Sequence, residues 1–244
     1  MNQIQLPPIV KNLLIINVLF FAATYVFQSK GEDLGAYLGA YYFDSPNFKI
    51  WQPITYMFMH GGFTHILFNM FALYMFGGVL ESRWGSKRFI NFYLITGLGA
   101  LALQWAVQAF EVYQITGTAF GNDSQMLKSL AQGMYNPAQF DALQATTLQG
   151  IYFVPMVGAS GAIFGLLVAF GMLYPNTELY IMFIPVPVKA KYIIPIYIVL
   201  ELFLGVASFQ GDSVAHYAHL GGALLGFILV KLWKDKNTYY DYYE

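Results

Sequence analysis

Six long apolar runs dominate this sequence and restrict what it can fold into. They cover about residues 10–27, 53–80, 89–110, 157–174, 192–209 and 214–233, and HGGFTH breaks the apolar part of the second run. Only 10% of the 244 residues are charged, against roughly a quarter in soluble domains. In a bilayer every backbone polar group must be bonded within the protein, so only helices and closed barrels can span it. Because the runs are continuous, they predict helices. We expect an all-α, polytopic bundle of six transmembrane helices, with residues 1–244 forming a single domain.

The composition also bears on partners and on processing. The formal net charge is −1, so nothing indicates a nucleic-acid partner. The chain contains no cysteine, which excludes disulfides and thiolate metal ligands. The N-terminal stretch lacks a basic segment followed by a small-residue cleavage site. We therefore expect the first apolar run to be a retained transmembrane helix that lies in the lipid bilayer.

The connecting segments differ in kind. Residues 29–52 are rich in aromatic side chains and only half polar, which is typical of a segment at the membrane interface. Residues 111–150 form a long polar insert that cannot span a bilayer, and SQMLKSLAQGM within it predicts a short surface helix. The stretch IPVPVKAK cannot form a regular helix, because Pro185 and Pro187 interrupt it.

Basic residues are distributed unequally between the two sides of the predicted bundle. If the N-terminus is cytoplasmic, the cytoplasmic segments hold nine of the twelve: Lys11, Arg83, Lys87, Arg88, Lys189, Lys191, Lys231, Lys234 and Lys236. The outer loops hold the other three: Lys30, Lys49 and Lys128. Cytoplasmic loops of membrane proteins carry an excess of Lys and Arg. We therefore expect both termini in the cytoplasm.

The four histidines lie in two of the apolar runs, where polar groups are costly and mark candidate functional sites. His60 and His65 belong to the second run, and His216 and His219 open the sixth. His65 and Asn69 are four residues apart, so they share one helix face. Taken alone, this pair is explained better by hydrogen bonds between helices than by catalysis.

Small residues in the fourth and sixth runs predict a close helix contact. His219, Gly222 and Gly226 fall on one face of the sixth run, and the two glycines have the GxxxG spacing. Gly161 and Gly165 repeat that spacing in the fourth run. GxxxG lets two helix backbones approach closely, and packing alone is a sufficient explanation for either motif.

The combination of these motifs favours chemistry, because close approach of the two runs brings Ser160 next to His219. A serine hydroxyl is a poor nucleophile without an adjacent base, and neutral imidazole is a suitable base near pH 7. Attack on an amide also requires donors for the developing oxyanion. His65, Asn69 and the backbone N–H of Ser160 are candidates. Glu201 is the intramembrane acid nearest in depth, but the sequence does not connect it to His219, so a Ser–His dyad is the simplest hypothesis.

Four motifs in this order resemble the rhomboid family of intramembrane serine proteases. They are MFMHGGFTHILFNM, ESRWGSKRF, GASGAIFG and AHYAHLGGALLG, and the resemblance extends from about residue 51 to 233. It implies a six-helix, rhomboid-like fold of the bacterial minimal type, located in the cytoplasmic (inner) membrane. It also implies cleavage of membrane-anchored substrates in or near their transmembrane segments, without a cofactor or a metal. The insert at 111–150 is longer than the minimal fold requires.

The resemblance also implies roles for individual residues. Ser160 would be the nucleophile and His219 its base, and His65 and Asn69 would stabilise the oxyanion. Gly158 matches the small residue that precedes the serine. Supporting positions are Gly161, Gly222, Gly226, His60 and His216.

Two other classes of protein remain open. A non-catalytic rhomboid-like protein that binds transmembrane helices would keep the glycines but lack Ser160 or His219, and both are present. A small transporter or channel would need paired acids or inverted repeats within its helices, and only Glu201 fits that requirement.

Overall fold

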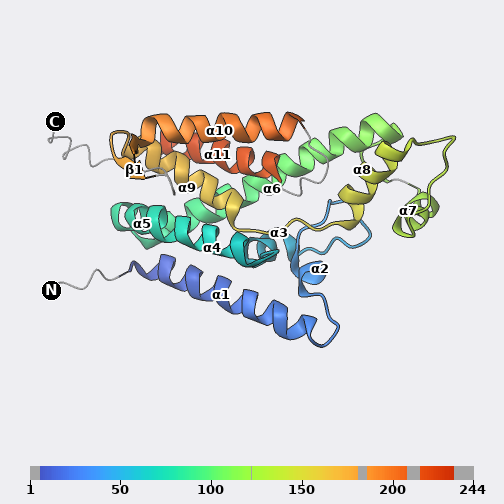
Figure 1. Cartoon of the computed structure of the whole chain (residues 1–244), viewed down its shortest axis with the longest axis horizontal. Helices are drawn as coiled ribbons and strands as arrows, with labels where there is room; N and C mark the ends of the chain where they lie inside the picture. Colours follow the sequence, from blue (N-terminus) through green and yellow to red (C-terminus); the bar gives the residue numbers. More distant parts are fainter. Residues whose placement is uncertain (1–5, 122, 181–185, 208–214, 234–244) are drawn as a thin grey trace.

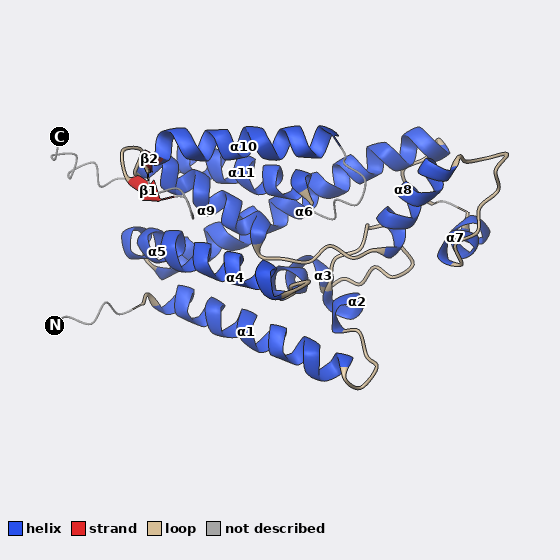
Figure 2. Cartoon of the chain, viewed as in Figure 1, coloured by secondary structure: helices blue, strands red, loops and turns tan. Residues whose placement is uncertain are grey.

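The computed structural model describes residues 6–121, 123–180, 186–207 and 215–233, and helices dominate this part of the chain (Figures 1 and 2). The long apolar elements are α1 (Pro8–Gln28), α4 (Phe63–Ala72), α5 (Gly78–Trp84), α6 (Ser86–Thr116), α9 (Ser160–Leu173), α10 (Ala190–Ala207) and α11 (His216–Leu232). The shorter elements are α2 (Leu34–Leu38), α3 (Gln52–Thr55), α7 (Ser124–Ala131), α8 (Ala142–Phe153), β1 (Glu178–Tyr180) and β2 (Pro187–Lys189). The expected all-α architecture is therefore present, apart from one antiparallel hairpin that pairs Glu178 with Lys189.

Four helical stretches in the described part are long and apolar enough to cross a membrane. They are Pro8–Gln28, Phe63–Trp84, Ser86–Thr116 and Ala190–Ala207. The apolar helices α9 and α11 are shorter, with 14 and 17 residues. The membrane character is thus supported, whereas the count of six spans stays a prediction. The predicted end of the fifth run, at 209, and the predicted start of the sixth run, at 214, lie outside the described residues. The tail after 233 also lies outside them.

The second apolar run does not form one continuous helix, and its interruption lies in HGGFTH, where the sequence predicts a break within the range 53–80. Its first residues form α3 and a 3₁₀ turn, and the spanning helix begins only at Phe63 and continues to Trp84. Gly61 and Gly62 separate the two parts, because glycine loses the most backbone entropy in a helix and Gly62 is extended here. A π-helical turn, Leu73–Gly77, joins α4 to α5.

The insert contains more structure than its polarity indicates. α6 extends to Thr116, past its predicted end at 110, and α7 forms where a surface helix is predicted. α8 was not predicted from the sequence, although a capping box of Asp141 and Gln144 begins it. These helices enclose a second apolar cluster: Tyr42, Val112, Leu127, Leu130, Phe140, Ala145, Leu148, Ile151 and Tyr152.

Tyr42 links this second cluster to the loop before α3. Its hydroxyl donates a hydrogen bond to the carbonyl oxygen of Ala119. Burial, together with the nearby Asp44 carboxylate, raises the pKa of Tyr42 to about 12. The phenol therefore stays protonated near neutral pH and keeps its role as a donor.

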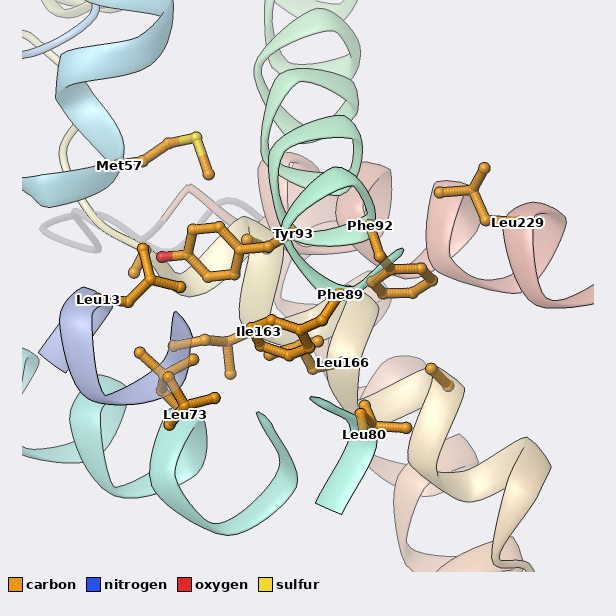
Figure 3. Close-up of a cluster of buried hydrophobic side chains, with 14 of the residues drawn as sticks. Leu13, Met57, Leu73, Leu80, Phe89, Phe92, Tyr93, Ile163, Leu166 and Leu229 are labelled. Atoms are coloured by element: carbon orange, nitrogen blue, oxygen red, sulfur yellow. The ribbon is translucent and has the colours of Figure 1, made fainter. Parts of the chain in front are cut away.

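The main core lies where α6, α9 and α11 pack together and α1, α4 and α5 cover them. Figure 3 shows the large side chains that fill it, including Phe89, Phe92 and Tyr93 from α6 and Ile163 and Leu166 from α9. Small residues allow the closest approaches: a Cβ at Gly165 would lie 2.7 Å from the Cβ of Thr96. The packing of α9 therefore combines bulky side chains such as Ile163 and Leu166 with glycines that allow a close approach to α6.

The start of α1 and the end of α11 lie at the same end of the bundle. The Glu81 carboxylate on α5 accepts hydrogen bonds from the backbone N–H groups of Ile9 and Val10, at 3.0 and 2.8 Å. The Arg88 guanidinium, at the start of α6, donates to the carbonyl oxygen of Trp233 at 2.8 Å. α7 and α8 lie at the opposite end of the long axis (Figure 1).

Candidate active site

Ser160 is placed by an extended segment that leads into α9. Ala40 and Met156 exchange two backbone hydrogen bonds of 2.9 and 2.8 Å, and the N–H of Gly158 donates to the carbonyl oxygen of Tyr56 at 3.0 Å. α9 then begins at Ser160 itself. Its 14 residues span about 21 Å, less than a hydrocarbon core of about 30 Å. Backbone polar groups at membrane depth need partners within the protein, and this pairing supplies them for Met156 and Gly158.

The structure brings Ser160 and His219 into hydrogen-bond distance. Ser160 Oγ lies 2.8 Å from His219 Nε2, although the residues are 59 positions apart. The predicted close approach of the fourth and sixth runs is present: a Cβ at Gly222 would overlap the carbonyl oxygen of Gly161. A helix pair without glycine at this crossing would hold the serine and the imidazole farther apart.

Two groups hold the imidazole of His219 from its other sides. The ring of Phe164, one turn after Ser160 on α9, stacks on it with centroids 4.3 Å apart and planes inclined by 8°. His219 Nδ1 lies 2.8 Å from Glu201 Oε2. The same oxygen lies 2.7 Å from His216 Nδ1. The sequence did not predict this contact between Glu201 and His219, because the two residues lie on different helices.

His65 lies beside Gly158 and Ser160. A Cβ at Gly158 would be 2.8 Å from His65 Nε2 and 3.4 Å from Ser160 Oγ, and the φ of Gly158 is +134°, which side chains rarely adopt. The N–H of Gly61 donates to His65 Nδ1 at 3.4 Å. Because Nδ1 accepts this bond, a neutral His65 carries its proton on Nε2, the nitrogen that faces Gly158.

Asn69 and His60 are buried polar side chains with unused hydrogen-bonding atoms. Asn69 is 5% exposed, lies one turn after His65 on α4, and its Nδ2 has no hydrogen-bond partner among the described residues. His60 packs edge-on against His65, with ring centroids 5.0 Å apart, and neither of its ring nitrogens has a partner within the same part of the chain. A buried unpaired donor costs about 1–3 kcal/mol. The free Asn69 amide is therefore available to a ligand.

A donor set for a metal ion occurs at the same place. Glu201, His216 and His219 each offer one ligand atom, and these atoms lie within 4.8 Å of one another. In this structure the Nδ1 atoms of both histidines instead lie at hydrogen-bond distance from the same carboxylate oxygen, Glu201 Oε2. The expected absence of a metal stays a prediction.

Comparison with known proteins identifies the family. Residues 47–234 match the family model described as Rhomboid domain, well over half of the 244-residue chain. This chain belongs to the rhomboid family. The family resemblance inferred from the four sequence motifs is thereby confirmed.

Individual rhomboid relatives match at moderate identity. An uncharacterized mitochondrial rhomboid protein of Schizosaccharomyces pombe is 26% identical over 210 residues, 78% of this chain and 53% of the relative. The chloroplastic rhomboid-like protein 11 of Arabidopsis thaliana is 26% identical over 230 residues, 90% of this chain and 63% of the relative. The rhomboid protease GlpG of Salmonella newport is 35% identical over 83 residues, 34% of this chain and 27% of the relative. This rhomboid chain thus spans less than two thirds of each relative's length.

Proposed function

We propose that this rhomboid-family chain is an intramembrane serine endopeptidase that cleaves peptide bonds in or near the transmembrane segments of membrane-anchored substrates. The 2.8 Å distance between Ser160 Oγ and His219 Nε2 carries this proposal. A serine hydroxyl next to an imidazole nitrogen is the arrangement that activates a nucleophile. The relative from Salmonella newport, which is named a protease, supports it.

In the first step Ser160 Oγ attacks the carbonyl carbon of the scissile peptide bond. The new C–O bond forms while the electron pair of the carbonyl double bond moves to its oxygen, and His219 Nε2 takes the hydroxyl proton. The tetrahedral intermediate then collapses and the C–N bond breaks. The imidazolium returns the proton to the leaving nitrogen, so one product departs as an amine and the other stays as an ester on Ser160.

In the second step water hydrolyses this ester. His219 removes a proton from the water as it attacks the carbonyl carbon, and the proton passes to Ser160 Oγ when the ester C–O bond breaks. The second product leaves as a carboxylic acid, and the serine hydroxyl is restored.

The negative charge on the tetrahedral oxygen requires donors already in place. His65 Nε2 and Asn69 Nδ2 fit this role in our proposal, together with the backbone N–H of Ser160 at the start of α9. Asn69 Nδ2 has no partner within the described ranges of the chain, and this supports its assignment, because a donor used only for packing would have one. Gly158 leaves the space that an oxyanion next to His65 needs.

We also propose that α9 and α11 cross the membrane, which together with the four longer apolar stretches makes six membrane passages. Both termini would then lie on the cytoplasmic side. Arg83, Lys87 and Arg88 lie at the turn between α5 and α6, the end of the bundle where α1 starts and α11 ends. Lys128 lies on α7, at the other end. The names of the relatives include mitochondrial and chloroplastic proteins, so they do not support the bacterial inner membrane in particular.

Incubation of the purified protein with a fluorescent model transmembrane substrate tests the proposal. We expect cleavage by the wild type and none by Ser160→Ala, and covalent reaction of a fluorophosphonate with Ser160 that requires His219. Unchanged cleavage by Ser160→Ala would show that Ser160 is not the nucleophile of the observed reaction. Substrate binding without cleavage or fluorophosphonate reaction would instead favour the non-catalytic rhomboid-like alternative.

A further inference from the structure

We propose that Glu201 is a positioning residue that turns the Ser160–His219 pair into a Ser–His–Glu triad. This inference rests on the proposed endopeptidase function. Glu201 comes from α10, a helix that contributes neither the nucleophile nor the base, and its side chain is 4% exposed. Its Oε2 lies 2.8 Å from His219 Nδ1, and His219 Nε2 lies 2.8 Å from Ser160 Oγ. The three side chains thus form one continuous hydrogen-bonded chain.

The contact with Glu201 selects the tautomer of His219. An ionised carboxylate only accepts hydrogen bonds, so His219 must carry a proton on Nδ1 to bond to it. A neutral imidazole with its proton on Nδ1 has its lone pair on Nε2, the nitrogen that faces Ser160. Without the carboxylate, the other tautomer becomes accessible and would direct an N–H at the serine. Glu201 therefore holds His219 in the form that accepts the hydroxyl proton.

Glu201 also faces a charge that exists only during the reaction. When His219 takes the proton from Ser160 it becomes an imidazolium in a buried site, and an unpaired buried charge is strongly unfavourable. The carboxylate 2.8 Å away balances it. The ring of Phe164 fixes the imidazole plane so that both nitrogens keep their directions.

His216 shares the carboxylate and fixes its position. It precedes His219 by one turn of α11, and its Nδ1 lies 2.7 Å from the same oxygen, Glu201 Oε2. Two donors on one helix thus hold the carboxylate of another helix. This arrangement accounts for the acid in α10 and for a histidine that the proposed reaction steps do not use.

Two substitutions of Glu201 separate its effects. Glu201→Gln keeps an oxygen acceptor but removes the charge, whereas Glu201→Met removes both with little change in volume. We expect kcat to fall by about 10²- to 10⁴-fold, more for methionine than for glutamine, with KM nearly unchanged. Glu201→Asp should recover part of the rate. Glu111→Gln, which changes a partly buried acid on α6, is the matched control and should leave kcat unchanged.

Nitrogen-15 NMR of labelled histidine gives a readout that does not depend on turnover. We expect His219 to carry its proton on Nδ1 in the wild type and to lose this preference in Glu201→Met. A wild-type His219 protonated on Nε2 would overturn the proposal, as would a kcat of Glu201→Met within threefold of the wild type.

A chelator distinguishes the triad from a metal site made of the same side chains. EDTA should leave the cleavage activity of the wild type unchanged. Loss of this activity in EDTA and its recovery on addition of Zn²⁺ would overturn the proposal. If the wild type neither cleaves the model substrate nor reacts with fluorophosphonate, the proposed endopeptidase function fails. The tautomer of His219 then still decides whether Glu201 orients it.

Discussion

At the scale of single residues, the polar groups around Ser160 differ in whether they already have partners. Ser160, His219 and Glu201 are bonded to one another in the resting protein, so their loss would affect the site before substrate arrives. Asn69 Nδ2 has no partner among the described residues. A role that begins only when an oxyanion forms explains this difference, because such a donor must be in place and free beforehand.

Asn69→Ala should therefore slow turnover and leave stability nearly intact. We expect kcat to fall by up to about 10²–10³, the usual effect of losing one preorganised donor. KM and the melting temperature should barely change, because the amide donor has no hydrogen bond to lose within the part of the chain that the structure describes. Kinetics of substrate cleavage and thermal unfolding in detergent, measured on the same preparation, check both expectations.

Asn17→Ala is the matched control, since Asn17 is a buried asparagine on α1 whose Nδ2 donates to the carbonyl oxygen of Leu13 at 2.7 Å. It should leave kcat unchanged. A large loss of stability in Asn69→Ala with wild-type kcat would reduce Asn69 to a packing residue and remove it from the proposed oxyanion site.

At the scale of elements, the contact between α9 and α11 determines the distance between Ser160 and His219. The two α11 glycines at the crossing, Gly222 and Gly226, meet backbone rather than flexible side chains: a Cβ at Gly226 would lie 2.7 Å from the Cα of Gly165. Backbone atoms cannot move aside without shifting a whole helix. Packing and chemistry therefore depend on the same residues, and the GxxxG spacing serves both.

Gly226→Ala should lower stability and activity together. We expect a loss of about 1–3 kcal/mol in the free energy of unfolding, the usual cost of overpacking, and a fall in kcat because α11 must move away from α9. Gly78→Ala is the control: a Cβ there meets nothing within 4 Å, so it should be neutral or more stable by roughly 0.5–1 kcal/mol. Melting curves and cleavage rates check both. Equal stability of the two variants would contradict the close packing described here.

At the scale of the whole molecule, the chain runs back and forth between two ends that differ in charge and structure. One end holds the turn after α5 and the β1–β2 hairpin, and the other holds α7, α8 and the second apolar cluster (Figure 1). Basic residues favour the first end, which the positive-inside rule assigns to the cytoplasm. In the proposed orientation the helical insert would lie on the outer side.

Cysteine labelling of intact cells or sealed vesicles tests this orientation. The chain has no cysteine, so single cysteines at Ser124, on α7, and at Asn176, before β1, can be labelled without background. Both positions are exposed. We expect a membrane-impermeant maleimide to reach Ser124→Cys only from outside and Asn176→Cys only from the cytoplasmic side. The reverse pattern would show that the topology is wrong.

The sequence by itself determined the kind of molecule and much of the proposed site. Long uncharged runs predict membrane helices because lipid offers no partner for backbone polar groups. The GxxxG spacing predicts where helices touch, and with the serine and histidine motifs it indicated both the family and the pairing of Ser160 with His219. Each motif is a local spacing along one helix, which a sequence states directly, and the pairing of Ser160 with His219 follows because two helices that both carry GxxxG can pack closely.

Only the tertiary structure decided which side chains from separate helices meet. Glu201 reaches His219 because α10 is rotated and shifted until its carboxylate faces α11, and no spacing within α10 encodes that placement. The apolar cluster around α8 likewise depends on what packs against that helix. A helix's own sequence determines its faces, but its rotation and depth relative to its neighbours follow from the packing of the whole bundle.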